Sequence, residues 1–152
     1  MIDSKVADSE FDKVSSNYED QLNRGISLSG ENSSFFAEKR IEHILSLIPR
    51  LNLKHEVIMD FGCGTGGSVR YLLKAFNPTS LTVVDISEES LKILKARYKT
   101  EQVISASPSA LKTNSNHDLC FCNGVFHHIL PNDRQNATKI IYDSLKPRGY
   151  FC

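Results

Sequence analysis

Four glycines and a carboxylate lie close together in residues 60–67, which have the sequence Asp-Phe-Gly-Cys-Gly-Thr-Gly-Gly. The apolar run Val57-Ile58-Met59 precedes them, and a helical pattern of apolar residues follows from Val69. Because glycine has no side chain, it lets a ligand approach backbone that other residues would cover, next to the N–H groups of a helix N-terminus. The segment is therefore predicted to be a ligand-binding loop between a strand and a helix.

The glycine spacing of this loop allows two interpretations. Gly62, Gly64 and Gly67 satisfy the G-x-G-x-x-G pattern, which places a dinucleotide's pyrophosphate on the helix N-terminus. Asp60, two residues before the first glycine, is poorly placed beside a pyrophosphate but well placed to bind an ammonium group. S-Adenosylmethionine carries such an ammonium, so Asp60 favours this cofactor over a nicotinamide dinucleotide.

A second carboxylate, Asp85, follows the apolar run Leu81 to Val84 and precedes Ile86 and Ser87. A carboxylate at the end of this strand can accept hydrogen bonds from both hydroxyls of a ribose. That contact suits NAD as well as S-adenosylmethionine, so Asp85 predicts recognition of adenosine in general. The alternative, in which Asp85 caps the next helix, is less favoured because Ser87 suits the N-cap position.

Three segments together resemble class I S-adenosylmethionine-dependent methyltransferases. Residues 60–67 resemble motif I of that family, which holds the methionine and ribose end of the cofactor. Residues 123–128, Asn-Gly-Val-Phe-His-His, resemble the N-G-V-x-H-H segment of members that act on small molecules, and this resemblance favours a methyltransferase over a dehydrogenase. Residues 145–150 resemble the turn before the family's fifth strand, except that Arg148 replaces the usual first glycine. Most of residues 34–152 fit the family.

The resemblance implies cofactor contacts from several parts of the chain. The expected contacts come from Tyr18, Arg40, Asp60, Gly62, Cys63, Gly64, Asp85, Ile86, Ser107 and Asn123. Arg40 is expected to pair with the methionine carboxylate, unless it is a solvated charge on its helix. Relatives often carry an acid after the third strand for the adenine amino group, whereas residues 105–108 are Ser-Ala-Ser-Pro. Adenine is therefore expected to contact Ser107 or backbone alone.

Methyl transfer from a sulfonium needs few catalytic groups, because alignment for in-line displacement and exclusion of water supply most of the rate. A general base is required only for an acceptor that loses a proton. His127 and His128 are candidates for that base, and the alternative is that they pack or line the pocket. No catalytic residue is assigned. An active methyltransferase with a small-molecule acceptor is expected, and the alternatives are an inactive cofactor-binding remnant and an oxidoreductase.

Alternating strand and helix patterns must position these residues. Strands are expected at residues 57–59, 81–84, 102–105, 119–122 and from 149, with helices from Ser34 to Pro49, over 69–76, from Ser87 to Tyr98 and over about 133–146. Right-handed crossovers between such units produce a doubly wound, Rossmann-like parallel α/β sheet, here in strand order 3-2-1-4-5. Ligands of such sheets bind at the carboxyl ends of the strands.

Two parts of the chain are distinguished. Residues 1–33 are expected to form an N-terminal helical cap, in which Phe11, Val14, Tyr18 and Leu22 recur at helical spacing. Residues 34–152 are expected to form the cofactor-binding domain. Because the sequence stops inside the expected fifth strand, where relatives add two strands and a helix, we expect a truncated domain and a homodimer through its exposed sheet edge.

Net charge, the longest apolar run, the N-terminus and the cysteines indicate which partners, compartment and metal sites to expect. Lysine plus arginine and aspartate plus glutamate number 18 each, so no net field attracts nucleic acid or anionic lipid. The run Leu119 to Leu130 is too short to span a bilayer, and the N-terminus lacks an export signal, so a cytoplasmic protein is expected. Cys120 and Cys122 lie near two histidines, but strand alternation and apolar neighbours favour buried thiols, and no metal is expected.

Overall fold

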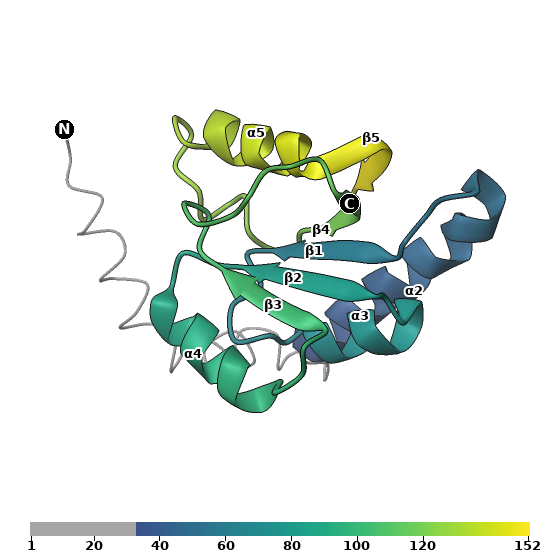
Figure 1. The fold of residues 1–152 in the computed structure, drawn as a ribbon, viewed down its shortest axis with the longest axis horizontal. Helices are drawn as coiled ribbons and strands as arrows, with labels where there is room; N and C mark the ends of the chain where they lie inside the picture. Colours follow the sequence, from purple (N-terminus) through teal and green to yellow (C-terminus); the bar gives the residue numbers. More distant parts are fainter. Residues whose placement is uncertain (1–32) are drawn as a thin grey trace, which may run out of the picture.

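The computed structural model describes residues 33–152 (Figure 1). The expected helical cap of residues 1–33, with Tyr18, lies outside the described residues, except for Ser33, where the helix α2 begins.

Within residues 33–152, five parallel strands form a single sheet in the order β3-β2-β1-β4-β5. These strands are β1 (Val57–Phe61), β2 (Ser80–Val84), β3 (Val103–Ala106), β4 (His117–Phe121) and β5 (Leu145–Phe151). The pairing of β1 with β2 is continuous, from Val57 opposite Ser80 to Phe61 opposite Val84. The fold class and strand order expected from the sequence are confirmed.

Helices cover both faces of the sheet (Figure 1). The helices are α2 (Ser33–Leu51), α3 (Val69–Phe76), α4 (Glu88–Arg97) and α5 (Arg134–Ser144). Figure 1 shows α2, α3 and α4 on one face and α5 on the other. Successive side chains of β1 enter opposite cores, because Ile58 packs toward α2 and α3 whereas Met59 packs toward α5. Strands covered on both faces explain the continuous apolar run at this point in the sequence.

The end of α2 differs from the expectation that Pro49 stops it. The helix continues through Pro49 to Leu51. Asn52 then adopts a left-handed conformation with φ of 50°, and the N–H of Leu53 bonds the carbonyl of Ile48 at 3.2 Å. This hydrogen-bonding pattern closes the last turn of a helix. A proline already has a helix-compatible φ, so Pro49 removes a donor without ending the helix by itself.

The strand β4 begins at His117, two residues before the start expected from apolar residues. His117 is 2% exposed, and its two ring nitrogens lie 3.1 Å from the carbonyl of Ser144 and 3.0 Å from Thr82 Oγ1. Burial lowers the pKa of His117. Asp118 accepts hydrogen bonds from the Val57 N–H and from the Lys146 ammonium. Both polar side chains are buried in the strand because each has partners.

The boundary between α5 and β5 was also predicted incorrectly. The helix ends at Ser144 instead of about Lys146, and β5 begins at Leu145 instead of Gly149. Proline disfavours helical geometry in the preceding residue, which here is Lys146. The early part of β5 is irregular, since His117 pairs with Leu145 and Leu119 already pairs with Tyr150. The turn expected within residues 145–150 is therefore a bulge within the strand.

Candidate functional site

Loops that follow β1, β2 and β4 bring the predicted residues together where the strands of the sheet end, which we call the carboxyl edge (Figure 1). The loop after β1 carries Gly62 to Gly67, the end of β2 leads to Asp85, and the end of β4 leads to Asn123. This is the edge at which parallel α/β sheets bind ligands.

Asp60, near the end of β1, is 2% exposed. Its Oδ2 accepts a hydrogen bond from the hydroxyl of Ser68, which directly precedes α3. Burial raises the pKa of the Asp60 carboxyl to about 7, the Ser68 hydrogen bond opposes this rise, and nearby Asp85 adds to it. Within residues 33–152, no donor bonds to Oδ1 of Asp60. A cationic group at this place would offset the charge of a buried carboxylate.

The glycines after β1 serve different purposes. Gly62 has a φ of +76°, and a Cβ built on it would lie 2.2 Å from Cγ2 of Val125. Gly64 has a φ of +52°, and a Cβ built there would have no neighbour within 4 Å. Gly62 is thus required for the close packing of Val125, whereas Gly64 exposes backbone to open space that a ligand could enter.

Gly62 and Cys63 tie the loop to β2. Their N–H groups both donate to the carbonyl of Val84, at 2.7 and 3.0 Å. Cys63 is 6% exposed, and burial raises the pKa of its thiol well above the ordinary value. Both residues build the loop, and direct cofactor contacts from them stay predictions.

Asp85 is half-buried and connects two loops. Its Oδ2 accepts a hydrogen bond from the Gly64 N–H at 2.8 Å, and its Oδ1 accepts one from the Ser87 N–H at 2.9 Å. Ser87 caps α4, because its hydroxyl accepts a hydrogen bond from the Ser90 N–H at 3.1 Å. Asp85 thus ties the glycine loop to the start of α4, and contacts of its carboxylate with ribose hydroxyls stay a prediction.

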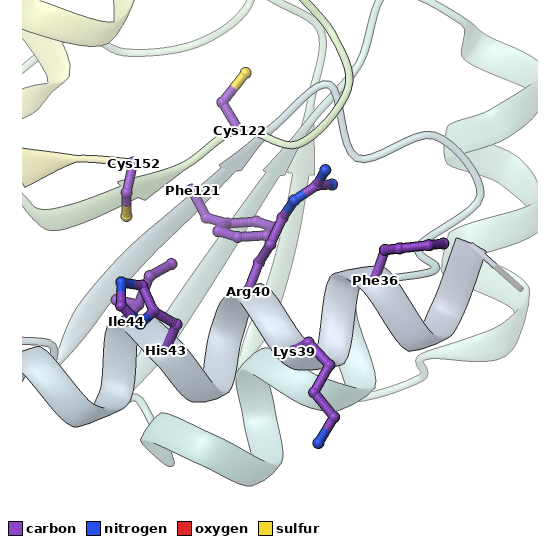
Figure 2. Close-up of a pocket in the computed structure, with 8 residues that line it drawn as sticks. All are labelled: Phe36, Lys39, Arg40, His43, Ile44, Phe121, Cys122 and Cys152. Atoms are coloured by element: carbon purple, nitrogen blue, oxygen red, sulfur yellow. The ribbon is translucent and has the colours of Figure 1, made fainter. Parts of the chain in front are cut away.

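Arg40 and Asn123, which are 83 residues apart in the sequence, meet in the fold. The Arg40 guanidinium donates from Nη1 to Oδ1 of Asn123. Figure 2 shows the Arg40 side chain extending from α2 toward the segment after β4. This contact brings together two residues that were both expected to contact the cofactor.

An open pocket lies beside Arg40, between α2 and the ends of β4 and β5 (Figure 2). It is lined by Phe36, Lys39, Arg40, His43, Ile44, Phe121, Cys122 and Cys152. The side chains of Cys122 and Cys152 point in opposite directions in Figure 2, and burial raises their pKa values to about 12 and 11. Among residues 33–152, no three His, Cys, Asp or Glu side chains are arranged to hold a metal ion.

The remaining predicted residues are His127, His128, Ile86 and Ser107. His127 and His128 are exposed, with ring centroids 3.9 Å apart, and partial burial followed by the neighbouring His127 lowers the pKa of His128. Ile86 is 46% exposed beside Asp85. The Ser107 hydroxyl already accepts a hydrogen bond from the Ala110 N–H at 3.3 Å, so it caps its own turn.

Two residues of the site were not predicted. Ser68 contacts Asp60, and Val125 packs on Gly62. Ser68 resembles an ordinary helix N-cap in the sequence, and Val125 resembles any apolar loop residue. Both roles depend on contacts across the fold, which no local pattern records.

A parallel sheet with a glycine-rich loop after β1 and a carboxylate after β2 defines a Rossmann-like domain for a nucleoside-containing cofactor. Residues 58–149 match the methyltransferase domain family, and the chain belongs to that family. The resemblance to class I S-adenosylmethionine-dependent methyltransferases is confirmed. This match also decides between the two interpretations of the glycine spacing.

The chain is similar to methyltransferases with different substrates in their names. It is 30% identical over 94 residues to malonyl-[acyl-carrier protein] O-methyltransferase of Priestia megaterium, and the aligned region covers 60% of this chain and 34% of that protein. It is 32% identical over 127 residues to ribosomal RNA small subunit methyltransferase C of Shewanella pealeana, and the aligned region covers 76% of this chain and 36% of that protein. The chain thus spans about a third of the length of these relatives.

Solved structures show the same fold. An S-adenosylmethionine-dependent methyltransferase from Clostridium acetobutylicum superimposes with a TM-score of 0.67 at 20% identity, over 89% of this chain and 55% of that chain. A TehB-like S-adenosylmethionine-dependent methyltransferase from Corynebacterium glutamicum gives a TM-score of 0.64 at 20% identity, over 90% and 70% of the two chains. No helix within residues 33–152 is long and apolar enough to cross a membrane.

Proposed function

We propose that this chain binds S-adenosylmethionine at the carboxyl edge of its sheet and provides the cofactor-binding part of a methyltransferase. The observation that carries the proposal is the meeting of Asp60, the glycine loop, Asp85 and the Arg40–Asn123 pair at that edge. Membership of the methyltransferase domain family supports it.

The proposed contacts follow the charges of the site. Asp60 binds the cofactor's ammonium, Arg40 its carboxylate, and Asp85 the ribose hydroxyls. The open space beside Gly64 receives the ligand next to its backbone. Ile86 contributes an exposed apolar surface for adenine.

Bound S-adenosylmethionine supplies a methyl group that its sulfonium already activates. The chain's own residues then need to hold the cofactor, orient the acceptor for in-line attack and exclude water. The exposed pair His127 and His128 is the proposed base for an acceptor that loses a proton, because the lowered pKa of His128 keeps it neutral and able to accept one.

A small-molecule acceptor is the finer part of the proposal. The balance of 18 basic and 18 acidic residues gives no net attraction for a nucleic-acid backbone. Ribosomal RNA is named for one relative, so the two acceptor classes need a direct comparison. Methyl transfer from labelled cofactor to a small-metabolite extract, but not to ribosomal RNA, would support the proposal, and the reverse result would contradict it.

Calorimetric titration of the full chain with S-adenosylmethionine, S-adenosylhomocysteine and NADH tests cofactor binding. Asp60→Asn and Asp85→Asn keep the side-chain size and remove the charge. Each should weaken binding of both sulfur compounds by about 10-fold or more, as expected for a hydrogen bond to a charged group. Asp143→Asn is the matched control, because Asp143 pairs with Lys139 on α5. Binding of NADH alone, or equal losses in all three variants, would contradict the proposal.

A further inference from the structure

Ser68 has the sequence position of a helix cap but does not act as one. It directly precedes α3, with φ of −83° and ψ of −24°, and its side chain makes no capping hydrogen bond. By contrast, Ser87 at the start of α4 has extended geometry and accepts a hydrogen bond from the Ser90 N–H. The Ser68 hydroxyl is therefore used for something other than the helix end.

The Ser68 hydroxyl donates to Oδ2 of Asp60. Both residues are buried, Ser68 at 9% and Asp60 at 2% exposure. This bond holds one carboxylate oxygen, and within residues 33–152 the other oxygen, Oδ1, accepts no hydrogen bond. A carboxylate held at a single oxygen keeps the other available for a donor from outside the protein.

We infer that Ser68 is a positioning residue for the cofactor: its hydroxyl orients the buried Asp60 carboxylate so that Oδ1 faces the ammonium of S-adenosylmethionine. The inference rests on the proposed function, because it concerns the same site. Ser68 does not touch the reacting atoms, so it acts through Asp60.

The surroundings of Asp60 explain why a donor is needed there. Burial and the carboxylate of Asp85 both favour the protonated form of Asp60, and the Ser68 hydroxyl favours the ionised form. Among residues 33–152, the thiols of Cys63, Cys120 and Cys122 also lie near Asp60, and burial raises their pKa values, so they stay uncharged near neutral pH. Without Ser68, the ionised carboxylate loses the only hydrogen-bond donor that the described residues supply.

The test combines two measurements on the wild-type chain, Ser68→Ala and Ser68→Thr. The first is the dissociation constant of S-adenosylmethionine from pH 6 to pH 9. The second is titration of the Asp60 carboxyl by carbon-13 NMR without cofactor. In Ser68→Ala we expect about 10-fold weaker binding at pH 7, and an upward move of the Asp60 titration by roughly one pH unit or more, the size of a hydrogen bond to a charged group.

Ser68→Thr keeps the hydroxyl and should restore both values to within about twofold, well inside the 10-fold step expected from loss of the hydrogen bond. Ser144→Ala is the matched control, since Ser144 is also buried and its hydroxyl donates to the carbonyl of Ile140 on α5. It should leave the pH profile of binding unchanged.

The outcomes separate this inference from the proposed function. If the wild-type chain binds the cofactor but Ser68→Ala leaves affinity or the Asp60 titration unchanged, the role of Ser68 is wrong and the proposed function stands. If the wild-type chain binds no S-adenosylmethionine, the proposed function fails and this role of Ser68 fails with it.

Discussion

Substitution of Gly62 by alanine would separate the packing of the binding loop from its contact with a ligand. The new Cβ would lie 2.2 and 2.7 Å from the two methyl carbons of Val125, so the valine or the backbone must move. Overpacking of this kind costs about 1–3 kcal/mol, and a side chain at left-handed φ adds about 1–2 kcal/mol. Gly62→Ala should therefore lower the free energy of unfolding by roughly 2–5 kcal/mol.

Gly64→Ala provides the comparison. Gly64 also has positive φ, but a Cβ there would have no neighbour within 4 Å. Its loss of stability should be only about 1–2 kcal/mol, from the backbone alone. If the open space beside Gly64 receives the cofactor, this variant should lose affinity for S-adenosylmethionine while it remains folded.

Urea unfolding followed by circular dichroism measures the stabilities, and calorimetry measures the affinities. The double variant Gly62→Ala with Val125→Ala removes the two closest carbons and leaves only the Val125 Cβ position, at 3.0 Å. It should recover at least about 1 kcal/mol relative to the sum of the single changes. Equal stability losses in Gly62→Ala and Gly64→Ala, or additive losses in the double variant, would refute the claim that contact with Val125 causes the larger loss at Gly62.

Two further predictions concern stability. The folded-state pKa of Asp60, about 7, lies above its ordinary value of 3.8, so this carboxyl's contribution is fully present below pH 3.8 and is lost as pH rises through 7. The stability of Asp60→Asn relative to wild type should therefore increase from about pH 4 to pH 7 and level off above that, at a gain of up to about 4 kcal/mol, whereas parallel pH curves in urea would contradict this. Arg148 has a φ of +70° in the bulge of β5, so Arg148→Gly should raise the free energy of unfolding by up to about 1 kcal/mol, and a loss in thermal unfolding would count against it.

The alternation of strand and helix patterns predicted a parallel α/β sheet, because β1 and β2 are mostly buried and right-handed crossovers leave few topologies. The strand order 3-2-1-4-5 followed from the Rossmann-like fold. The hydrophobic pattern located the ends of elements less well. His117 and Asp118 are polar, so the pattern hid the start of β4, and their partners Thr82, Ser144 and Lys146 come from other elements.

The candidate site was predicted in the same uneven way. Glycines and carboxylates that follow strands carry a local signal, and the fold brings Asp60, Gly64 and Asp85 to one edge as expected. The role of Ser68 carries no such signal, because a serine before a helix normally predicts a cap. Cofactor contacts of these residues, and the expected association of two copies, stay predictions for calorimetry and light scattering.

We expect the burial of Asp60 to link the lifetime of the protein to the concentration of S-adenosylmethionine. A buried ionised carboxylate weakens the ligand-free fold at the pH where it would attract an ammonium most strongly. A ligand that binds only the folded state stabilises it in proportion to the logarithm of its concentration. We therefore expect proteases to degrade the ligand-free chain faster above pH 7, and saturating S-adenosylmethionine to protect it most in that range. Selection for a stable empty protein and for a strongly binding one would favour different residues at position 60.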